Sequence, residues 1–189
     1  METAFGWLGQ IFDALLQFVP RITIVRNTHA AVKWKPFGKV VAIEGGRRTF
    51  YWPLVTEIDQ IVVARQTDTL PPQVLTTKDG KAVAVGAFMV YRISDVVKAI
   101  GEKNWDVEST VRDITMASIT EEVASRGLNQ ILDTMSGEGN FHEILTSNCR
   151  KQLRQFGVYV ERVGLTDFAE CKVHKVFGVA SQLPLGEES

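Results

Sequence analysis

The chain has 189 residues, 45% of them hydrophobic, and its 21 lysines and arginines nearly balance its 22 aspartates and glutamates. This length and apolar content suit one domain or two small, closely packed ones. The formal net charge of −1 disfavours nucleic-acid binding, because no excess of positive charge would attract a polyanion to the chain as a whole.

The first predicted element is an amphipathic helix over residues 4–19. Asp13 is the only charged residue in this range. At 100° per residue, Gly6, Gln10, Asp13 and Gln17 share one narrow face of the helix. The opposite face carries the expected membrane-anchoring residues, which are Phe5, Trp7, Leu8, Ile11, Phe12, Leu15, Leu16, Phe18 and Val19.

Such a helix is about 24 Å long, which is shorter than the ~30 Å hydrocarbon core of a bilayer. We therefore expect it to lie in the membrane interface, with docking on the protein's own core and true spanning as the alternatives. The chain opens Met-Glu-Thr, without the positive start of a signal peptide. The segment is accordingly expected to stay on the mature protein.

After Pro20 the pattern changes to short strands, predicted at residues 22–26, 31–34, 40–44 and 47–52, with turn residues between them. These strands predict a small β-rich lobe. Basic and aromatic residues in and around it are candidates for contact with lipid headgroups, namely Arg21, Arg26, Lys33, Trp34, Lys35, Lys39, Arg47 and Arg48. The alternative is that the lysines protect a solvated sheet edge against strand addition.

A second group of strands follows. Residues 61–70 read as a strand, and Pro71-Pro72 predict an edge or a bend because proline donates no backbone hydrogen bond. The sequence Lys78-Asp79-Gly80 predicts a hairpin with a type I′ turn before a strand that begins near Ala82. Both faces of that strand are apolar, which predicts a central position in the sheet with helices on one side.

Two main helices are predicted next. After a helix start at Ser94-Asp95, Asp106 is the expected N-cap of a helix to about Arg126, and Gly127 the expected left-handed stop. Its inner stripe is expected to include Val107, Val111 and Ile114. Two pairs of opposite charge at spacing four are expected on its surface, Glu108 with Arg112 and Glu122 with Arg126.

The second helix is predicted to begin at Asn140, with Glu143 completing a capping box. Its apolar residues recur at a spacing of four, and they are Phe141, Leu145, Cys149 and Leu153. Gly157 is expected to end it, and residues 158–165 are expected to return as a strand.

No combination of residues in the sequence predicts a catalytic or metal-binding site. His142 and Cys149 are about 10 Å apart along one helix, too far for a nucleophile and its base. Cys171 and His174 are two ligands and do not make a metal site. The sequence has no phosphate-binding loop, dinucleotide fingerprint or nucleophile elbow. We therefore expect no catalytic residue, cofactor or metal, and Cys149 is expected in the core.

Two stretches together resemble a known family. Thr76 to Ile93 places an Asp-Gly turn before a long strand that ends Tyr91-Arg92-Ile93, and Leu153 to Asp167 reads LRQFGVYVERVGLTD. This order is similar to the SPFH or Band 7 family of stomatin, prohibitin, flotillin and HflK/HflC. The resemblance implies an α+β domain over residues 21–168, in which a small β-rich lobe precedes two helices packed on a mostly antiparallel sheet.

The resemblance also implies a function. It predicts a non-catalytic membrane scaffold, peripheral or monotopic, with residues 1–20 as anchor and the domain facing the cytoplasm. Membrane lipid, other copies of the chain or other SPFH proteins, and a membrane-anchored AAA protease or a channel are the implied partners. Residues 169–189 do not match the long Ala/Glu-rich helix of the family, so any assembly is expected to use the domain itself or another chain. The alternative is a soluble protein-binding adaptor whose first helix covers its own core or a partner's groove.

Overall fold

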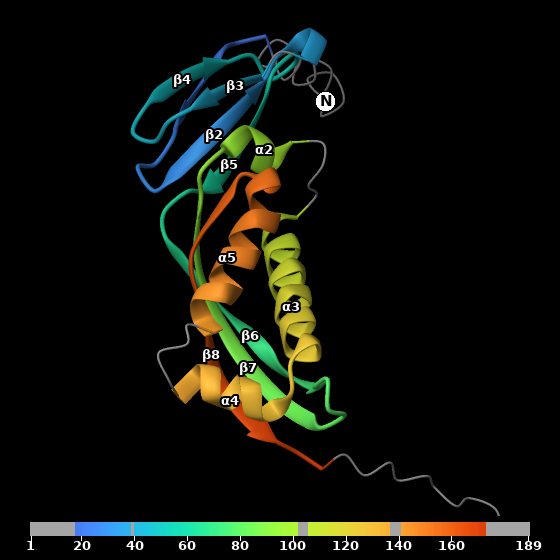
Figure 1. The fold of residues 1–189 in the computed structure, drawn as a ribbon. Coiled ribbons are helices and arrows are strands. Elements are labelled where there is room, and N and C mark those ends of the chain that lie inside the picture. Colours follow the sequence, from blue (N-terminus) through green and yellow to red (C-terminus); the bar gives the residue numbers. More distant parts are fainter. Residues whose placement is uncertain (1–17, 39, 102–105, 137–140, 173–189) are drawn as a thin grey trace, which may run out of the picture.

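The computed structural model describes residues 18–38, 40–101, 106–136 and 141–172, and they form an elongated molecule (Figure 1). A small β-rich lobe lies at one end, and a larger lobe of three long strands and several helices makes up the rest. The helix predicted over residues 4–19 therefore lies outside the described residues, apart from Phe18 and Val19. Residues 173–189 lie outside them as well.

The small lobe contains two antiparallel sheets. A two-stranded ribbon joins β1 (Arg21–Ile24) to β4 (Arg48–Tyr51), and a three-stranded sheet has the order β3 (Val40–Ile43), β2 (His29–Trp34), β5 (Glu57–Val62). A single 3-10 turn, η2 (Pro36–Gly38), follows β2. The four strands predicted before residue 53 are all present. Their buried side chains are small, with Val25, Ala31 and Val32 fully buried.

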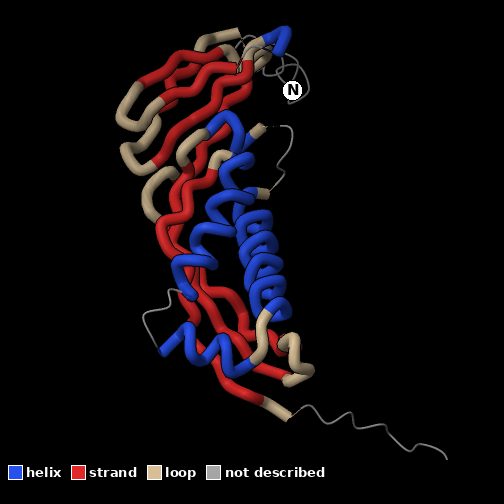
Figure 2. The backbone as a smooth tube through the Cα atoms, viewed as in Figure 1, coloured by secondary structure: helices blue, strands red, loops and turns tan. Residues whose placement is uncertain are grey.

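The larger lobe is built on an antiparallel sheet with the order β6 (Gln66–Thr76), β7 (Ala82–Ile93), β8 (Val158–Glu170). Two helices, α3 (Val107–Ser125) and α5 (Phe141–Leu153), pack side by side on one face of this sheet (Figure 2). Shorter helical segments complete the lobe, and they are α2 (Val96–Ile100), α4 (Leu128–Ser136) and the 3-10 turn η3 (Arg154–Phe156). β7 is the central strand, as its two apolar faces predict.

The core of the larger lobe lies between the sheet and these helices. Alternate residues of β7, including Val83, Val85 and Met89, are buried against the helices. From α5, the four residues at spacing four, Phe141, Leu145, Cys149 and Leu153, are fully buried. The periodicity of the sequence therefore identified the inner faces of the central strand and of α5 correctly.

Several predicted boundaries in the strands differ from the structure. The strand expected over residues 61–70 is divided, because β5 ends at Val62 and β6 begins at Gln66 in another sheet. Pro71-Pro72 lie within the edge strand β6, where the pairing with β7 shifts register between Leu70 and Gln73. This location agrees with the predicted edge or bend.

The β6–β7 hairpin forms where the sequence predicts it, but its turn differs from type I′. The Gly80 amide donates to the Thr77 carbonyl at 3.0 Å, and Gly80 adopts a left-handed conformation with φ of 77°. Thr77 and Lys81 close the loop through the Thr77 amide and the Lys81 carbonyl at 2.9 Å. This is the pattern of a three-residue loop with a bulge at the glycine.

The helix boundaries also need correction. Asp106 caps α3 as predicted, since its carboxylate accepts from the Glu108 and Ser109 amides. Gly127 is not a left-handed stop. Instead, α3 ends because the backbone of Arg126 is extended, with φ of −123° and ψ of 152°. A further helix, α4, begins at Leu128. The prediction of two main helices on the sheet therefore omitted α4.

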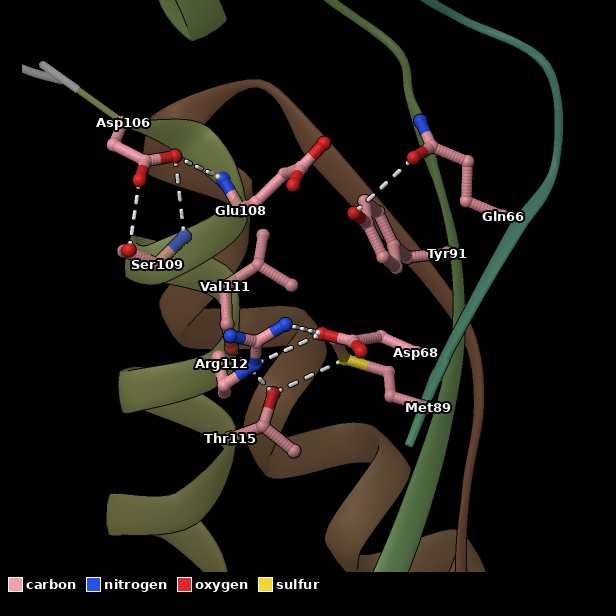
Figure 3. Close-up of polar contacts among 10 residues, drawn as sticks. All are labelled: Gln66, Asp68, Met89, Tyr91, Asp106, Glu108, Ser109, Val111, Arg112 and Thr115. Atoms are coloured by element: carbon pink, nitrogen blue, oxygen red, sulfur yellow. Dashed lines mark hydrogen bonds and ion pairs between the residues drawn. The ribbon is translucent and has the colours of Figure 1, made fainter. Parts of the chain in front are cut away.

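Polar contacts fix α3 to the sheet (Figure 3). Arg112 pairs with Asp68 of β6, with Nη2 and Oδ2 3.0 Å apart, and not with Glu108 as its spacing predicted. The Thr115 hydroxyl lies 3.1 Å from the sulfur of Met89. The second expected pair, Glu122 with Arg126, is present. Of the two ion pairs predicted within α3, one is therefore replaced by an ion pair between α3 and β6.

Candidate functional site

The outer face of the β1–β4 ribbon is apolar and exposed. Ile22 lies directly opposite Phe50 in the pairing register, and Ile24 lies two residues further along β1. Because strand residues two apart point to the same side, these three side chains share one face. They are 58%, 62% and 62% exposed in the order Ile22, Ile24, Phe50. We call them the apolar ribbon face.

The segments that enter and leave the ribbon extend this apolar character. The exposed residues there, the apolar flanks, are Phe18, Val19, Trp52, Leu54 and Val55. Together with the ribbon face they make up eight of the thirteen large hydrophobic side chains that are exposed in the described part of the chain. A concentration of exposed apolar side chains of this kind is typical of surfaces that contact a partner or a membrane.

The structure brings four of the predicted headgroup residues to this ribbon. Arg21 and Arg48 lie on its strands, and Arg48 is directly opposite Ile24 on the apolar face. Arg47 immediately precedes Arg48, and its carbonyl accepts from the Val25 amide at 3.0 Å. Arg26 is the residue after Val25, so it lies just beyond the end of the ribbon. All four arginines are exposed. The pairing register places Arg48 on the apolar face and Arg21, opposite Tyr51, on the other face of the ribbon, and Arg47 pairs with Glu44 at 3.3 Å.

The other predicted headgroup residues are placed differently. Lys33 donates from its ammonium to the Phe50 carbonyl, and Trp34 donates from Nε1 to Asp59 Oδ2 at 2.7 Å. The first contact joins the three-stranded sheet to the ribbon, and the second joins β2 to β5 within the three-stranded sheet. Lys35 is exposed beside η2, and Lys39 lies outside the described residues. Lys33 and Trp34 therefore have structural contacts within the lobe.

Sequence reasoning missed the apolar ribbon face. It placed the candidate contacts on basic residues, on the aromatic residues beside them, including Phe50, and on the helix before Pro20, and it read Ile22 and Ile24 only as strand residues. The alternation Ile22-Thr23-Ile24 contained the signal, because it assigns one apolar face to a strand. What the sequence could not show is that, among the described residues, no other element of the small lobe covers this face.

The opposite face of the ribbon borders a cleft of about 780 Å³. Thr23 and Tyr51 line it from the ribbon, and Trp34 and Ile58 line it from the three-stranded sheet. Leu54 belongs to both the cleft and the apolar flanks. The ribbon is therefore a thin layer with an apolar outer face and an aromatic-lined cleft beneath it.

The residues considered for catalysis have structural environments. Burial raises the pKa of the Cys149 thiol, which lies in the core as predicted. His142 Nδ1 accepts from the Leu165 amide at 3.4 Å on the edge of β8. Within the described ranges, no group of three or more histidine, cysteine, aspartate or glutamate side chains is arranged to hold a metal ion. Across the same residues, no helix has the length and apolar content needed to span a bilayer.

Comparison with known proteins agrees with this architecture. The family model described as "SPFH domain / Band 7 family" matches residues 23–173. An uncharacterized protein of Archaeoglobus fulgidus is 23% identical over 126 residues, which is 67% of this chain and 50% of that protein. An uncharacterized protein of Methanocaldococcus jannaschii is 29% identical over 128 residues, covering 67% of this chain and 63% of that protein. The match thus spans between half and two thirds of each archaeal relative.

Proposed function

The chain belongs to the SPFH domain or Band 7 family, and from this premise we propose that it is a non-catalytic membrane-associated scaffold that contacts lipid through the end of its small lobe. The apolar ribbon face is the observation that carries the proposal. Ile22, Ile24 and Phe50 lie on one exposed face, and the segment leading into β1 comes from the predicted amphipathic helix.

The energetics of this surface support an interfacial contact. Full burial of a large apolar side chain contributes about 1.5–3 kcal/mol, and the ribbon face offers three such side chains. An arginine near an anionic membrane surface adds about 1 kcal/mol, and in this proposal Arg48, which lies opposite Ile24, would make such a contact, with Arg26 as a second candidate. Stable membrane attachment generally needs more than one such signal. The ribbon face would supply the second, beside residues 5–19.

The scaffold role includes assembly. We propose that copies of the chain associate with one another, or with other SPFH proteins, while the small lobe faces the bilayer and the larger lobe extends into the cytoplasm. This orientation follows from placing the apolar ribbon face on the lipid, because the small lobe and the helix α4 lie at opposite ends of the molecule (Figure 1). Regulation of a membrane protease or a channel would be a consequence of such an assembly.

A liposome flotation experiment tests the membrane contact. The intact chain is compared with the triple variant Ile22→Ser, Ile24→Ser, Phe50→Ser, and with a chain that starts at Arg21, at low and high salt. Val41→Ser, Val74→Ser, Leu132→Ser is the matched control, because it removes three exposed hydrophobic side chains away from the ribbon. We expect the control to float like the intact chain and the ribbon variant to lose about tenfold or more in bound fraction.

Salt dependence separates the two contributions to binding. Flotation that persists at high salt identifies apolar insertion, whereas flotation that is lost at high salt identifies the arginines as the main contact. If neither the intact chain nor the variants float at either salt concentration, the membrane proposal is wrong. A soluble adaptor, with residues 5–19 covering the ribbon face, then becomes the better account.

A further inference from the structure

A second candidate site lies in the larger lobe, away from the apolar ribbon face. A cavity of about 400 Å³ opens between the last turns of α5 and the start of β8. Val158 and Tyr159 form its apolar side, and Ser94 and Ser147 contribute hydroxyl groups. Its remaining lining residues are Arg150, Lys151 and Arg154. We call this cavity the α5 basic pocket.

No carboxylate side chain lines the α5 basic pocket beside its three cationic side chains. Asp95, the residue after Ser94, pairs with Lys98 at 3.0 Å, and Glu161, two residues after Tyr159, pairs with Arg65 at 3.0 Å. This concentration of positive charge occurs in a chain whose net charge is −1. An anion would therefore gain from the pocket much more than from the average surface of the protein.

A fourth cation adds to this field. Arg92 of β7 lies directly opposite Tyr159 in the sheet, and its guanidinium carbon is 5.2 Å from the centroid of the Tyr159 ring. The guanidinium carbon of Arg150 is 5.0 Å from the same centroid. Two guanidinium groups thus contact one aromatic ring, and an anion bound beside the ring would interact favourably with both.

The pocket is also held in shape. Arg150 donates through Nε to the Val160 carbonyl at 3.0 Å, which fixes its guanidinium along the edge of β8. On the other side of the pocket, the Ser94 hydroxyl donates to the Gly157 carbonyl at 3.0 Å, which connects the end of β7 to the start of β8. Lys151 and Arg154 make no ion pair with a carboxylate of the described residues. Their charges therefore remain available to a ligand.

We propose that the α5 basic pocket binds the phosphate group of a phosphomonoester. Such a group is nearly dianionic at neutral pH and presents three acceptor oxygens, which suit arginine and lysine donors. The apolar surface of Val158 and the Tyr159 ring would contact the organic part attached to the phosphate. This inference does not rest on the proposed membrane function, because the pocket shares no residue with the ribbon.

Isothermal titration calorimetry tests the proposal by measuring the affinity of the full chain for phenyl phosphate and for inorganic phosphate. Lys151→Gln, Arg154→Gln removes two cations from the pocket without touching Arg150, whose contacts hold β8. Lys78→Gln, Lys172→Gln is the matched control, since it removes the same charge from exposed positions outside the pocket. We expect affinity for phenyl phosphate to fall about tenfold or more in the pocket variant and to be unchanged in the control.

A second variant tests the shape of the site separately from its charge. Ser147→Leu keeps the net charge and places a larger side chain into the cavity, so we expect it to weaken phenyl phosphate binding as well. Equal binding by the wild type, the pocket variant and Ser147→Leu would overturn the proposal. An equal loss in the pocket variant and the lysine control would also overturn it, because general electrostatic attraction would then explain binding.

The two sources of a phosphomonoester are distinguished with vesicles. The Ile22→Ser, Ile24→Ser, Phe50→Ser chain, which lacks the ribbon contact, is mixed with phosphatidylcholine vesicles that do or do not contain phosphatidic acid. Binding to phosphatidic acid that Lys151→Gln, Arg154→Gln abolishes assigns the pocket to a lipid headgroup. Binding of phenyl phosphate in solution without binding to these vesicles assigns it to a soluble phosphorylated molecule. Either result supports the phosphate site, and the absence of both contradicts it.

Discussion

Asp79 caps a helix that begins much further along the chain. It lies in the β6–β7 turn, yet its carboxylate oxygens accept from the Leu128 amide, 49 residues later, at 3.2 and 3.3 Å. The Lys78 amide donates to the Arg126 carbonyl at 2.9 Å beside it. The hairpin tip thus caps the start of α4 and explains why a new helix begins there. A carboxylate in this position also suits the positive end of the helix dipole.

This contact predicts a pH dependence of stability. The hydrogen bond from the Thr77 hydroxyl, together with that from the Leu128 amide, lowers the pKa of Asp79 from the ordinary value of an aspartate. A depressed folded-state pKa stabilises the protein above the unfolded value, and this contribution is lost as pH falls through the folded pKa. We therefore expect Asp79→Asn to be less stable than the wild type at neutral pH and to lose less stability on acidification.

Urea unfolding followed by circular dichroism, from neutral pH to about pH 3, measures this difference. Asp95 and Asp106 also have lowered pKa values, caused first by the hydrogen bonds from Lys98 and Ser109. The variant should accordingly retain part of the acid sensitivity. A gap between wild type and Asp79→Asn that stays constant over the whole pH range would show that the charge of Asp79 has no role in the cap.

At the scale of elements, Gly157 joins α5, α2 and β8. It adopts a left-handed conformation with φ of 72° after η3, and its carbonyl accepts from the Ser94 and Asp95 amides at 2.8 and 3.0 Å. A Cβ atom at this position would lie 2.2 Å from the Asp95 carbonyl oxygen. Because these hydrogen bonds hold the two backbones together, neither can move away without losing them.

Two glycine-to-alanine variants separate the conformational cost from the clash. Gly80 has nearly the same φ, 77°, but a Cβ there would have no atom within 4 Å. Gly80→Ala should therefore cost about 1–2 kcal/mol from the left-handed backbone alone. Gly157→Ala should cost at least about 3 kcal/mol, since overpacking adds to that strain. Equal losses in urea unfolding would mean that the backbone near Asp95 yields easily.

Comparison of these elements with the sequence shows what local patterns can and cannot predict. The central strand β7, the inner face of α5 and the Asp106 cap follow from residues within each element. The start of α4 depends on Asp79, which is remote in sequence, so no local pattern marked it. Gly127 looked like a helix stop because glycine often ends helices, but the extended Arg126 ends α3. The pairing of Arg112 with Asp68 likewise depends on the sheet and not on helical spacing.

At the scale of the molecule, the two lobes differ in how their strands are supported. β7 pairs on both sides, with β6 and with β8, and it is buried against the helices. The ribbon has two strands and four paired positions, and its outer face is exposed. Isolated two-stranded units are only marginally stable in water. The candidate membrane contact therefore lies on the part of the fold that has the least support of its own, and only the three-dimensional structure shows this.

This asymmetry predicts where lipid should change hydrogen exchange. In buffer, amides of β1 and β4 should exchange much faster than those of β7, because local opening of the ribbon breaks few contacts. Addition of anionic vesicles should slow exchange in β1 and β4 and leave β7 unchanged, since lipid would bury Ile22, Ile24 and Phe50 and make opening of the ribbon costly. Exchange followed by mass spectrometry resolves these segments. New protection confined to α5 and the start of β8 would instead place the lipid contact at the α5 basic pocket and contradict the ribbon as the membrane-facing surface.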